Sequence, residues 1–195
     1  MNRYDFAERT IHWLSALSFV YAAFTGLALW SHKLYWLASV FGGGNATRFA
    51  HPWAGLMFAL VFGMMFRRWA GQMRLDRDDR VWLKNSHKYA MNQDEGLPEP
   101  GRFNAGQKML FWLQAMAGIA LVVSGVVLWF PEWMPRTLRL AAVAMHPLVA
   151  VLAIALIILH VYMGTAAVPG AFKAMIDGRV TRQWAKAHHA KWLRG

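Results

Sequence analysis

The stretch LAAVAMHPLVAVLAIALIILHVYMGTAA, residues Leu140–Ala167, is almost purely apolar, yet it contains two histidines, His146 and His160. An apolar run of this length predicts a helix that spans a membrane. Imidazoles are costly in hydrocarbon and mark functional sites there. Fourteen residues separate the two histidines, which is roughly 21 Å and almost four turns of helix, so both rings lie on one face. In a hydrocarbon layer about 30 Å thick, that face offers a nitrogen ligand near each side.

The composition of the whole chain indicates a membrane protein. Of its 195 residues, 57% are hydrophobic and 16% are charged, whereas soluble domains are about 25% charged. The net charge of +11 would suggest nucleic-acid binding in a soluble protein, but here the basic residues lie between apolar runs, as membrane topology requires. The chain has no cysteine, which excludes thiolate-held iron–sulfur clusters, covalently attached haem and disulfides within it.

Four apolar runs predict an all-α fold, an integral membrane four-helix bundle that makes up one membrane domain, residues 1–195. We expect the spans at about residues 11–30, 49–66, 109–130 and 140–166. A polar loop, residues 67–108, joins the second and third spans. In the tail, residues 170–195, basic residues alternate with tryptophans, which predicts an amphipathic helix on the membrane surface.

The distribution of basic residues predicts the orientation. Four spans place both termini on the same side as the loop 67–108. Of the 21 Lys and Arg residues, all but four lie in the N-terminus, this loop and the tail; the four on the other side are Lys33, Arg48, Arg136 and Arg139. Because basic segments remain in the cytoplasm, both termini and the loop are expected there.

This orientation assigns four histidines to two depths. His12 begins the first span and His160 lies towards the end of the fourth, so both are expected near the cytoplasmic side. His51 begins the second span and His146 lies early in the fourth, so both are expected near the outer side. The sequence therefore predicts an inner pair, His12 with His160, and an outer pair, His51 with His146.

Two imidazoles at each depth, with no carboxylate or thiolate beside them, suit the axial positions of two b-type haems. Iron held in this way has no open position, so it carries electrons and does not bind oxygen. Zinc is disfavoured, because its structural sites are usually four-coordinate and contain cysteine. The alternative is a haem-free membrane anchor or proton-pathway protein, in which these histidines link helices or relay protons. The other four histidines lie outside the apolar runs and are expected at the surface: His32, His87, His188 and His189.

Small residues in the spans and one polar stretch before the third span also bear on the prediction of bound haem. The small residues Gly26, Ala54, Gly55, Gly118 and Gly125 give a macrocycle room between helices or allow close helix packing. Asn104 and Gln107, just before the third span, have the polar groups to bind a quinone carbonyl near the inner haem. Their spacing is also that of a helix capping box, and from the residues alone capping is the favoured interpretation.

The order of the motifs resembles one known family. The matching stretches are ERTIHW at residues 8–13, HPWAG at 51–55, FNAGQK at 103–108, HP at 146–147, HVYM at 160–163, MIDGRV at 175–180 and WAKAHH at 184–189. They cover nearly the whole chain. The chain resembles the gamma subunit, the cytochrome b subunit, of respiratory membrane-bound formate dehydrogenase.

This resemblance implies a cofactor set and site residues. It implies a bundle with two haem b groups, His51 and His146 binding the outer iron and His12 and His160 the inner iron. Asn104 matches a residue of the family's menaquinone pocket, and Gln107 is included by its proximity. Whether the quinone is menaquinone or ubiquinone stays open.

The resemblance also implies the partners and the place in the cell. We expect a multi-pass protein of the bacterial inner membrane, a respiratory-chain subunit that passes electrons from an iron–sulfur beta subunit to quinone. Formate oxidation belongs to an alpha subunit with a molybdenum or tungsten pterin, so no catalytic residue is expected in this chain. The nearest alternative is the cytochrome b subunit of a membrane-bound nickel–iron hydrogenase or a related oxidoreductase.

Overall fold

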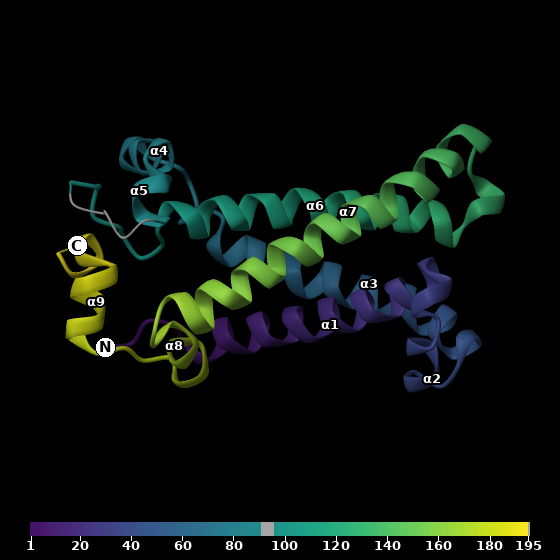
Figure 1. The fold of residues 1–195 in the computed structure, drawn as a ribbon, viewed down its shortest axis with the longest axis horizontal. Coiled ribbons are helices and arrows are strands. Elements are labelled where there is room, and N and C mark those ends of the chain that lie inside the picture. The colour runs from purple at the N-terminus through teal and green to yellow at the C-terminus, as the bar shows by residue number, and fades with distance from the viewer. Residues whose placement is uncertain (91–95, 195) are drawn as a thin grey trace. The chain divides into compact units, whose positions relative to one another are not determined.

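The computed structural model describes residues 1–90 and 96–194, and its regular elements there are helices (Figure 1). Four helices are long and apolar enough to cross a membrane. They are α1 (Phe6–Trp30), α3 (Gly44–Trp69), α6 (Ala105–Trp129) and α7 (Arg136–Tyr162), the last continuing into the π-helical turn η3 (Met163–Ala167). The all-α, four-span prediction is confirmed.

Short helical segments connect and follow the four long helices. The α-helical ones are α2 (Leu37–Val40), α4 (Arg77–Lys84), α5 (Ser86–Ala90), α8 (Ala171–Asp177) and α9 (Arg182–His188). The 3₁₀ turns are η1 (His32–Leu34), η2 (Pro131–Trp133) and η4 (Ala190–Leu193).

The long helices extend beyond the apolar runs because polar interface residues continue them. Gly42 and Gly43 adopt φ values of +85° and +91°, a conformation that suits glycine. The backbone turns there, and the Thr47 hydroxyl donates to the Gly43 carbonyl at 2.9 Å, so α3 begins at Gly44.

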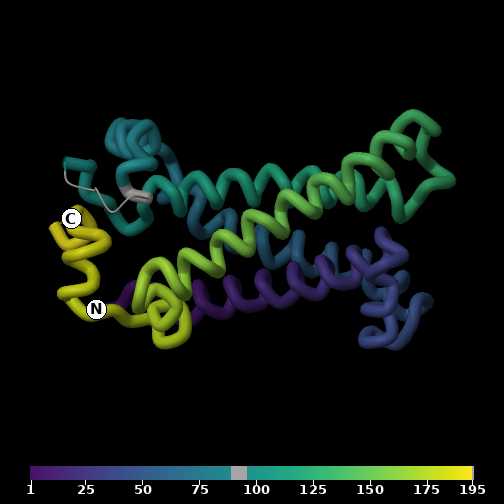
Figure 2. The backbone as a smooth tube through the Cα atoms, in the orientation of Figure 1, coloured from purple at the N-terminus to yellow at the C-terminus, as the bar shows by residue number. Residues whose placement is uncertain are grey.

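Figure 2 traces α1 in purple and α7 in green as continuous coils.

The chain divides into two compact units, and the larger part of each long helix belongs to the second, residues 7–66 and 114–159. In this unit small residues are buried, among them Ser15, Thr25, Ala28, Ser124 and Ala153, while large apolar ones such as Leu17, Phe24, Ile119 and Leu152 are exposed. The Gln114 side chain donates to the Ala153 carbonyl at 3.1 Å and so joins α6 to α7. Small and polar residues between helices, with apolar residues outside, are what a lipid environment selects.

The first unit, residues 1–6, 67–113 and 160–195, brings the two ends of the chain together. Met1 and Val180 exchange backbone hydrogen bonds of 2.8 and 3.0 Å, and the Arg3 N–H donates to the Gly178 carbonyl at 2.8 Å. Gly178 has a φ of +76° and ends α8, so the tail contains two short helices with a turn between them. The N-terminal segment therefore lies against the turn between α8 and α9, where Figure 1 places the N label.

A buried arginine–histidine pair holds these termini. Arg3 and His189 are 3% and 2% exposed, and the Arg3 guanidinium donates to His189 Nε2 at 2.8 Å. His189 Nδ1 in turn donates to the Gly101 carbonyl at 2.7 Å. Burial, together with the charge of Arg3, lowers the pKa of His189 to about 3, so the ring is neutral. The surface position expected for His189 is wrong.

Candidate functional site

The structure brings the two histidines of the outer pair together. His51 lies in α3 and His146 in α7, and both precede a proline within the helix. The ring centres are 6.1 Å apart and the ring planes are nearly perpendicular, at 83°. Both rings are half-buried. Two residues far apart in the sequence thus present their imidazoles to each other within one compact unit.

Each ring of this pair is hydrogen-bonded to a hydroxyl group on a neighbouring helix. His51 Nδ1 lies 3.1 Å from the Thr25 hydroxyl of α1, and His146 Nδ1 lies 2.9 Å from the Ser124 hydroxyl of α6. Among the residues that the structure describes, neither Nε2 atom has a hydrogen-bond partner. All four long helices therefore contribute to the outer site.

The geometry of the pair fits an iron held between two imidazoles. A metal–imidazole bond of about 2 Å, with each ring centre roughly 1 Å beyond its nitrogen, puts the two centres about 6 Å apart. The observed separation of 6.1 Å agrees with this value. Within residues 1–90 and 96–194 there is no group of three or more His, Cys, Asp or Glu that suits a metal ion. Two imidazoles are the donors that a b-type haem takes, whereas structural zinc is usually held by four ligands.

Aromatic side chains gather near the ends of the long helices in this unit. Trp53 of α3 meets Trp129 of α6 edge to face at 5.3 Å between ring centres. Phe130 stacks on both Trp129 and Trp133, at 5.3 Å in each case. Aromatic clusters at the ends of spanning helices are typical of the membrane–water interface.

The two histidines of the inner pair occupy the opposite ends of α1 and α7. His12 lies two turns into α1, with its ring against Trp13 at 5.3 Å between centres. His160 lies in the last turn of α7, just before the π-helical turn η3. The two residues belong to different compact units, and their pairing stays a prediction.

Asn104 and Gln107 form the capping box that their spacing indicates. The Gln107 N–H donates to Asn104 Oδ1 at 2.8 Å, and the Asn104 N–H donates to Gln107 Oε1 at 3.0 Å. This reciprocal pair starts α6. It uses only the oxygen of the Asn104 side chain; among the described residues, the Nδ2 amide donates no hydrogen bond. Capping therefore leaves Asn104 with a free donor for a ligand carbonyl.

The loop before Asn104 is fixed from both ends of the chain. Arg3 donates to the Arg102 carbonyl at 3.0 Å, and Arg102 donates to the Arg3 carbonyl at 2.7 Å. His189 holds Gly101, as described above. These contacts could not be predicted from the sequence, because Arg3 and His189 are 186 residues apart and each resembles an ordinary polar residue near a terminus.

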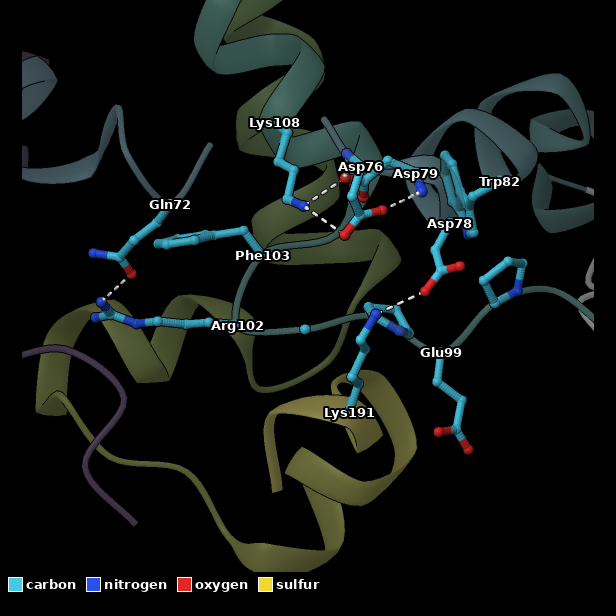
Figure 3. Close-up of a pocket in the computed structure, with 14 residues that line it drawn as sticks. Gln72, Asp76, Asp78, Asp79, Trp82, Glu99, Arg102, Phe103, Lys108 and Lys191 are labelled. Atoms are coloured by element: carbon cyan, nitrogen blue, oxygen red, sulfur yellow. Dashed lines mark hydrogen bonds and ion pairs between the residues drawn. The ribbon is translucent and has the colours of Figure 1, made fainter. Parts of the chain in front are cut away.

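A cavity of about 210 Å³, with several charged side chains in its lining, opens beside this loop (Figure 3). Lys108 points into it and donates to Asp79 at 2.5 Å, with 10% and 9% of the two side chains exposed. Asp76 caps α4, and the backbone N–H of Asp79 holds the pKa of the Asp76 carboxyl below its usual value. The cavity lies against Phe103 and Ala105, the residues on either side of Asn104.

Comparison with known proteins identifies the family of this chain. The family described as prokaryotic cytochrome b561 matches residues 3–178. The formate dehydrogenase cytochrome b556(fdo) subunit of Escherichia coli K12 is 38% identical, over 98% of this chain and 91% of that protein. The nitrate-inducible cytochrome b556(Fdn) subunit of the same organism is 32% identical over 98% and 89%. The formate dehydrogenase cytochrome b556 subunit of Haemophilus influenzae is 28% identical over 98% and 82%.

Proposed function

The chain belongs to the prokaryotic cytochrome b561 family, together with the cytochrome b556 subunits of formate dehydrogenase, and from this premise we propose a function for it. It is a di-haem subunit of a formate dehydrogenase, and it carries electrons from an iron–sulfur partner subunit across the membrane to quinone. Membership of a cytochrome b family and four apolar helices make it a haem b protein of the bacterial inner membrane.

The main support for the proposal is the arrangement of His51 and His146. Their ring centres are 6.1 Å apart, and each Nδ1 atom is hydrogen-bonded to a hydroxyl group. Such a pair would hold one haem b, which supplies one-electron transfer when it is bound. With two imidazoles holding the iron, no position would stay open for oxygen or other ligands. The apolar helices around them keep the site dry.

The inner site of the proposal consists of His12 and His160. The distribution of basic residues supports it, since it assigns the start of α1 and the end of α7 to the same, cytoplasmic side. The same distribution puts His51 and His146 at the outer side, where an iron–sulfur subunit outside the membrane is expected to deliver electrons. Formate oxidation then takes place on a separate pterin-containing subunit.

The quinone end of the proposal is centred on Asn104. Its Nδ2 group is free to donate to a quinone carbonyl, and the capping box with Gln107 fixes its orientation. The loop that precedes it is held by Arg3 and His189. Quinone reduction consumes protons, and the cavity around Lys108 and Asp79 offers cytoplasmic water a place beside this loop.

Haem content tests the proposal against its alternatives. We expect the purified protein to show the sharp reduced α-band of low-spin b-type haem and to contain two haems per chain by a pyridine haemochrome assay. A colourless, well-folded preparation would contradict the proposal and favour a haem-free anchor. Two haems in a preparation that co-purifies with a hydrogenase would favour the alternative of a hydrogenase subunit.

The substitution Asn104→Ala tests the quinone end. We expect it to slow quinone reduction by about fivefold or more, since a hydrogen bond to a bound ligand is worth about 1 kcal/mol or more. Haem content is expected to stay at two per chain. The measurement is the rate of quinone reduction by the reduced complex.

The control for this prediction is Asn104→Asp, which keeps a capping oxygen for the Gln107 N–H but removes the Nδ2 donor. If quinone binding needs the donor, both variants are slow. If Asn104 only caps α6, the Asp variant reduces quinone at the unchanged rate, and the assignment of Asn104 to the quinone site is wrong.

A further inference from the structure

The outer histidines share a local arrangement that occurs twice. A hydroxyl residue followed by glycine, Thr25-Gly26 on α1, faces His51. The equivalent pair on α6, Ser124-Gly125, faces His146. In each case the hydroxyl contacts Nδ1, and the glycine lies against the Cε1 edge of the same ring. Two independent helices thus meet two independent rings in the same way.

The hydrogen bonds of the hydroxyls decide which nitrogen carries the proton. The Thr25 hydroxyl lies 2.7 Å from the Tyr21 carbonyl, and a carbonyl can only accept. A hydroxyl has a single hydrogen, so Thr25 donates to its own helix and accepts from the Nδ1–H of His51. The same reasoning holds on α6, where Ser124 donates to the Ala120 carbonyl at 2.6 Å. Both rings are therefore protonated at Nδ1, and both keep a lone pair at Nε2.

The glycines make room for the rings. A Cβ at position 26 would lie 3.0 Å from His51 Cε1, which is closer than normal packing allows. A Cβ at position 125 would lie 3.4 Å from His146 Cε1, again a tight contact. The two glycines therefore leave room for the imidazoles.

Back-bonding to the preceding turn is common for Ser and Thr in membrane helices, and it explains the bonds to Tyr21 and Ala120. It does not explain why both hydroxyls also meet an imidazole nitrogen. Thr25 is fully buried and Ser124 is 9% exposed, so neither hydroxyl bonds bulk water. Each hydroxyl oxygen is therefore held in place as a hydrogen-bond acceptor for the Nδ1–H group of the facing ring.

We propose that Thr25 and Ser124 are positioning residues of the outer haem: they hold His51 and His146 as Nδ1–H tautomers, with Nε2 as the iron ligand, and they tune the reduction potential. This inference rests on the proposed function. Partners behind a ligating histidine orient the ring and raise its basicity. A more basic ligand favours the ferric state, so these hydroxyls lower the potential of the outer haem.

The variants Thr25→Val and Ser124→Ala test the proposal in the purified protein. Thr25→Val keeps the shape of the side chain but removes its hydroxyl. We expect each variant to bind the outer haem 10- to 100-fold more weakly, which is the usual effect of removing such a partner. We also expect a more positive midpoint potential for the haem that remains bound, measured by optical redox titration, and an altered low-spin EPR signal. The inner haem is expected to keep its potential and serves as an internal reference.

The matched control is Ser18→Ala on α1. The Ser18 hydroxyl also donates to its own helix, to the Leu14 carbonyl at 2.8 Å, but contacts no imidazole among the described residues. It is expected to change neither affinity nor potential. Thr25→Ser, which keeps the hydroxyl, is expected to restore wild-type values.

Gly26→Ala gives an independent test of the ring position, with Gly63→Ala on α3 as its control, because nothing lies within 4 Å of a Cβ at position 63. Gly26→Ala is expected to weaken the outer haem, and Gly63→Ala is not. If the hydroxyl variants match wild type in affinity, potential and EPR signal, Thr25 and Ser124 serve only their own helices and the inference is overturned. Failure of the proposed function is a different result, in which the wild-type protein itself lacks the outer haem.

Discussion

Replacing His146 by alanine is expected to reduce the haem content from two per chain to one and to abolish electron transfer from formate to quinone. In the proposed function this ring is one of the two imidazoles that would hold the outer haem, and the ring centre of its partner His51, on α3, lies 6.1 Å away. With one imidazole left, the site would lose its affinity for the haem and the low-spin signal would disappear. His51→Ala is expected to remove the same haem, because the two rings act as one site. The measurements are haem per chain, the low-spin EPR signals and formate-dependent quinone reduction.

The control for this pair is His32→Ala. His32 lies in η1, on the same predicted side of the membrane, and is exposed. It is expected to leave both haems and the activity unchanged. If either His146→Ala or His51→Ala keeps both haems, or if the two variants lose different haems, the outer pair does not bind one iron. The proposed electron path would then lose its entry point.

The sequence predicted the spans well because hydropathy follows directly from the lipid environment. The runs found at residues 11–30 and 140–166 lie within α1 and within α7 with its η3 turn. The ends of the helices were less predictable, since polar residues at the interface continue a helix without adding hydropathy. The start of α3 at Gly44 depends on two glycines with positive φ and on the Thr47 hydroxyl, which are local backbone features.

The proximity of His51 and His146 could be predicted from their expected depth in the membrane, because only histidines at the same depth can meet. The hydroxyl groups that contact the two rings could not be predicted in this way. Thr25 and Ser124 read as ordinary small polar residues, and only the rotation of α1 and α6 about their axes decides what they face. The pair Thr25-Gly26 and the pair Ser124-Gly125 are a visible pattern in the sequence, but their meaning appears only once the facing ring is known.

The first unit was harder to predict because its contacts join distant segments. His188 and His189 are neighbours in a basic tail, yet His189 is 2% exposed, whereas His188 is less enclosed. The difference comes from Arg3 at the other end of the chain and from the carbonyl of Gly101. In contrast, the capping box of Asn104 and Gln107 is local, and its spacing predicted it correctly.

The substitutions His12→Ala and His160→Ala are each expected to remove the inner haem and leave the outer one. Both residues are assigned to the cytoplasmic side by the distribution of basic residues. Electrons from formate then still reduce the outer haem, but quinone reduction falls to the background rate, because the last carrier before the quinone is missing. The measurements are the haem content and the formate-reduced optical spectrum of each variant.

The double variant decides whether His12 and His160 form one site. If they bind the same iron, replacing both has the effect of replacing either one, since a single lost ligand already empties the site. If they serve different sites, the double variant loses more haem than either single variant, and the pairing is wrong. His87→Ala is the control and is expected to keep two haems, because this exposed histidine lies in the loop that is predicted to be cytoplasmic. Retention of the inner haem in both single variants would assign these imidazoles to helix contacts or proton relay, and the electron path would have to reach the quinone without them.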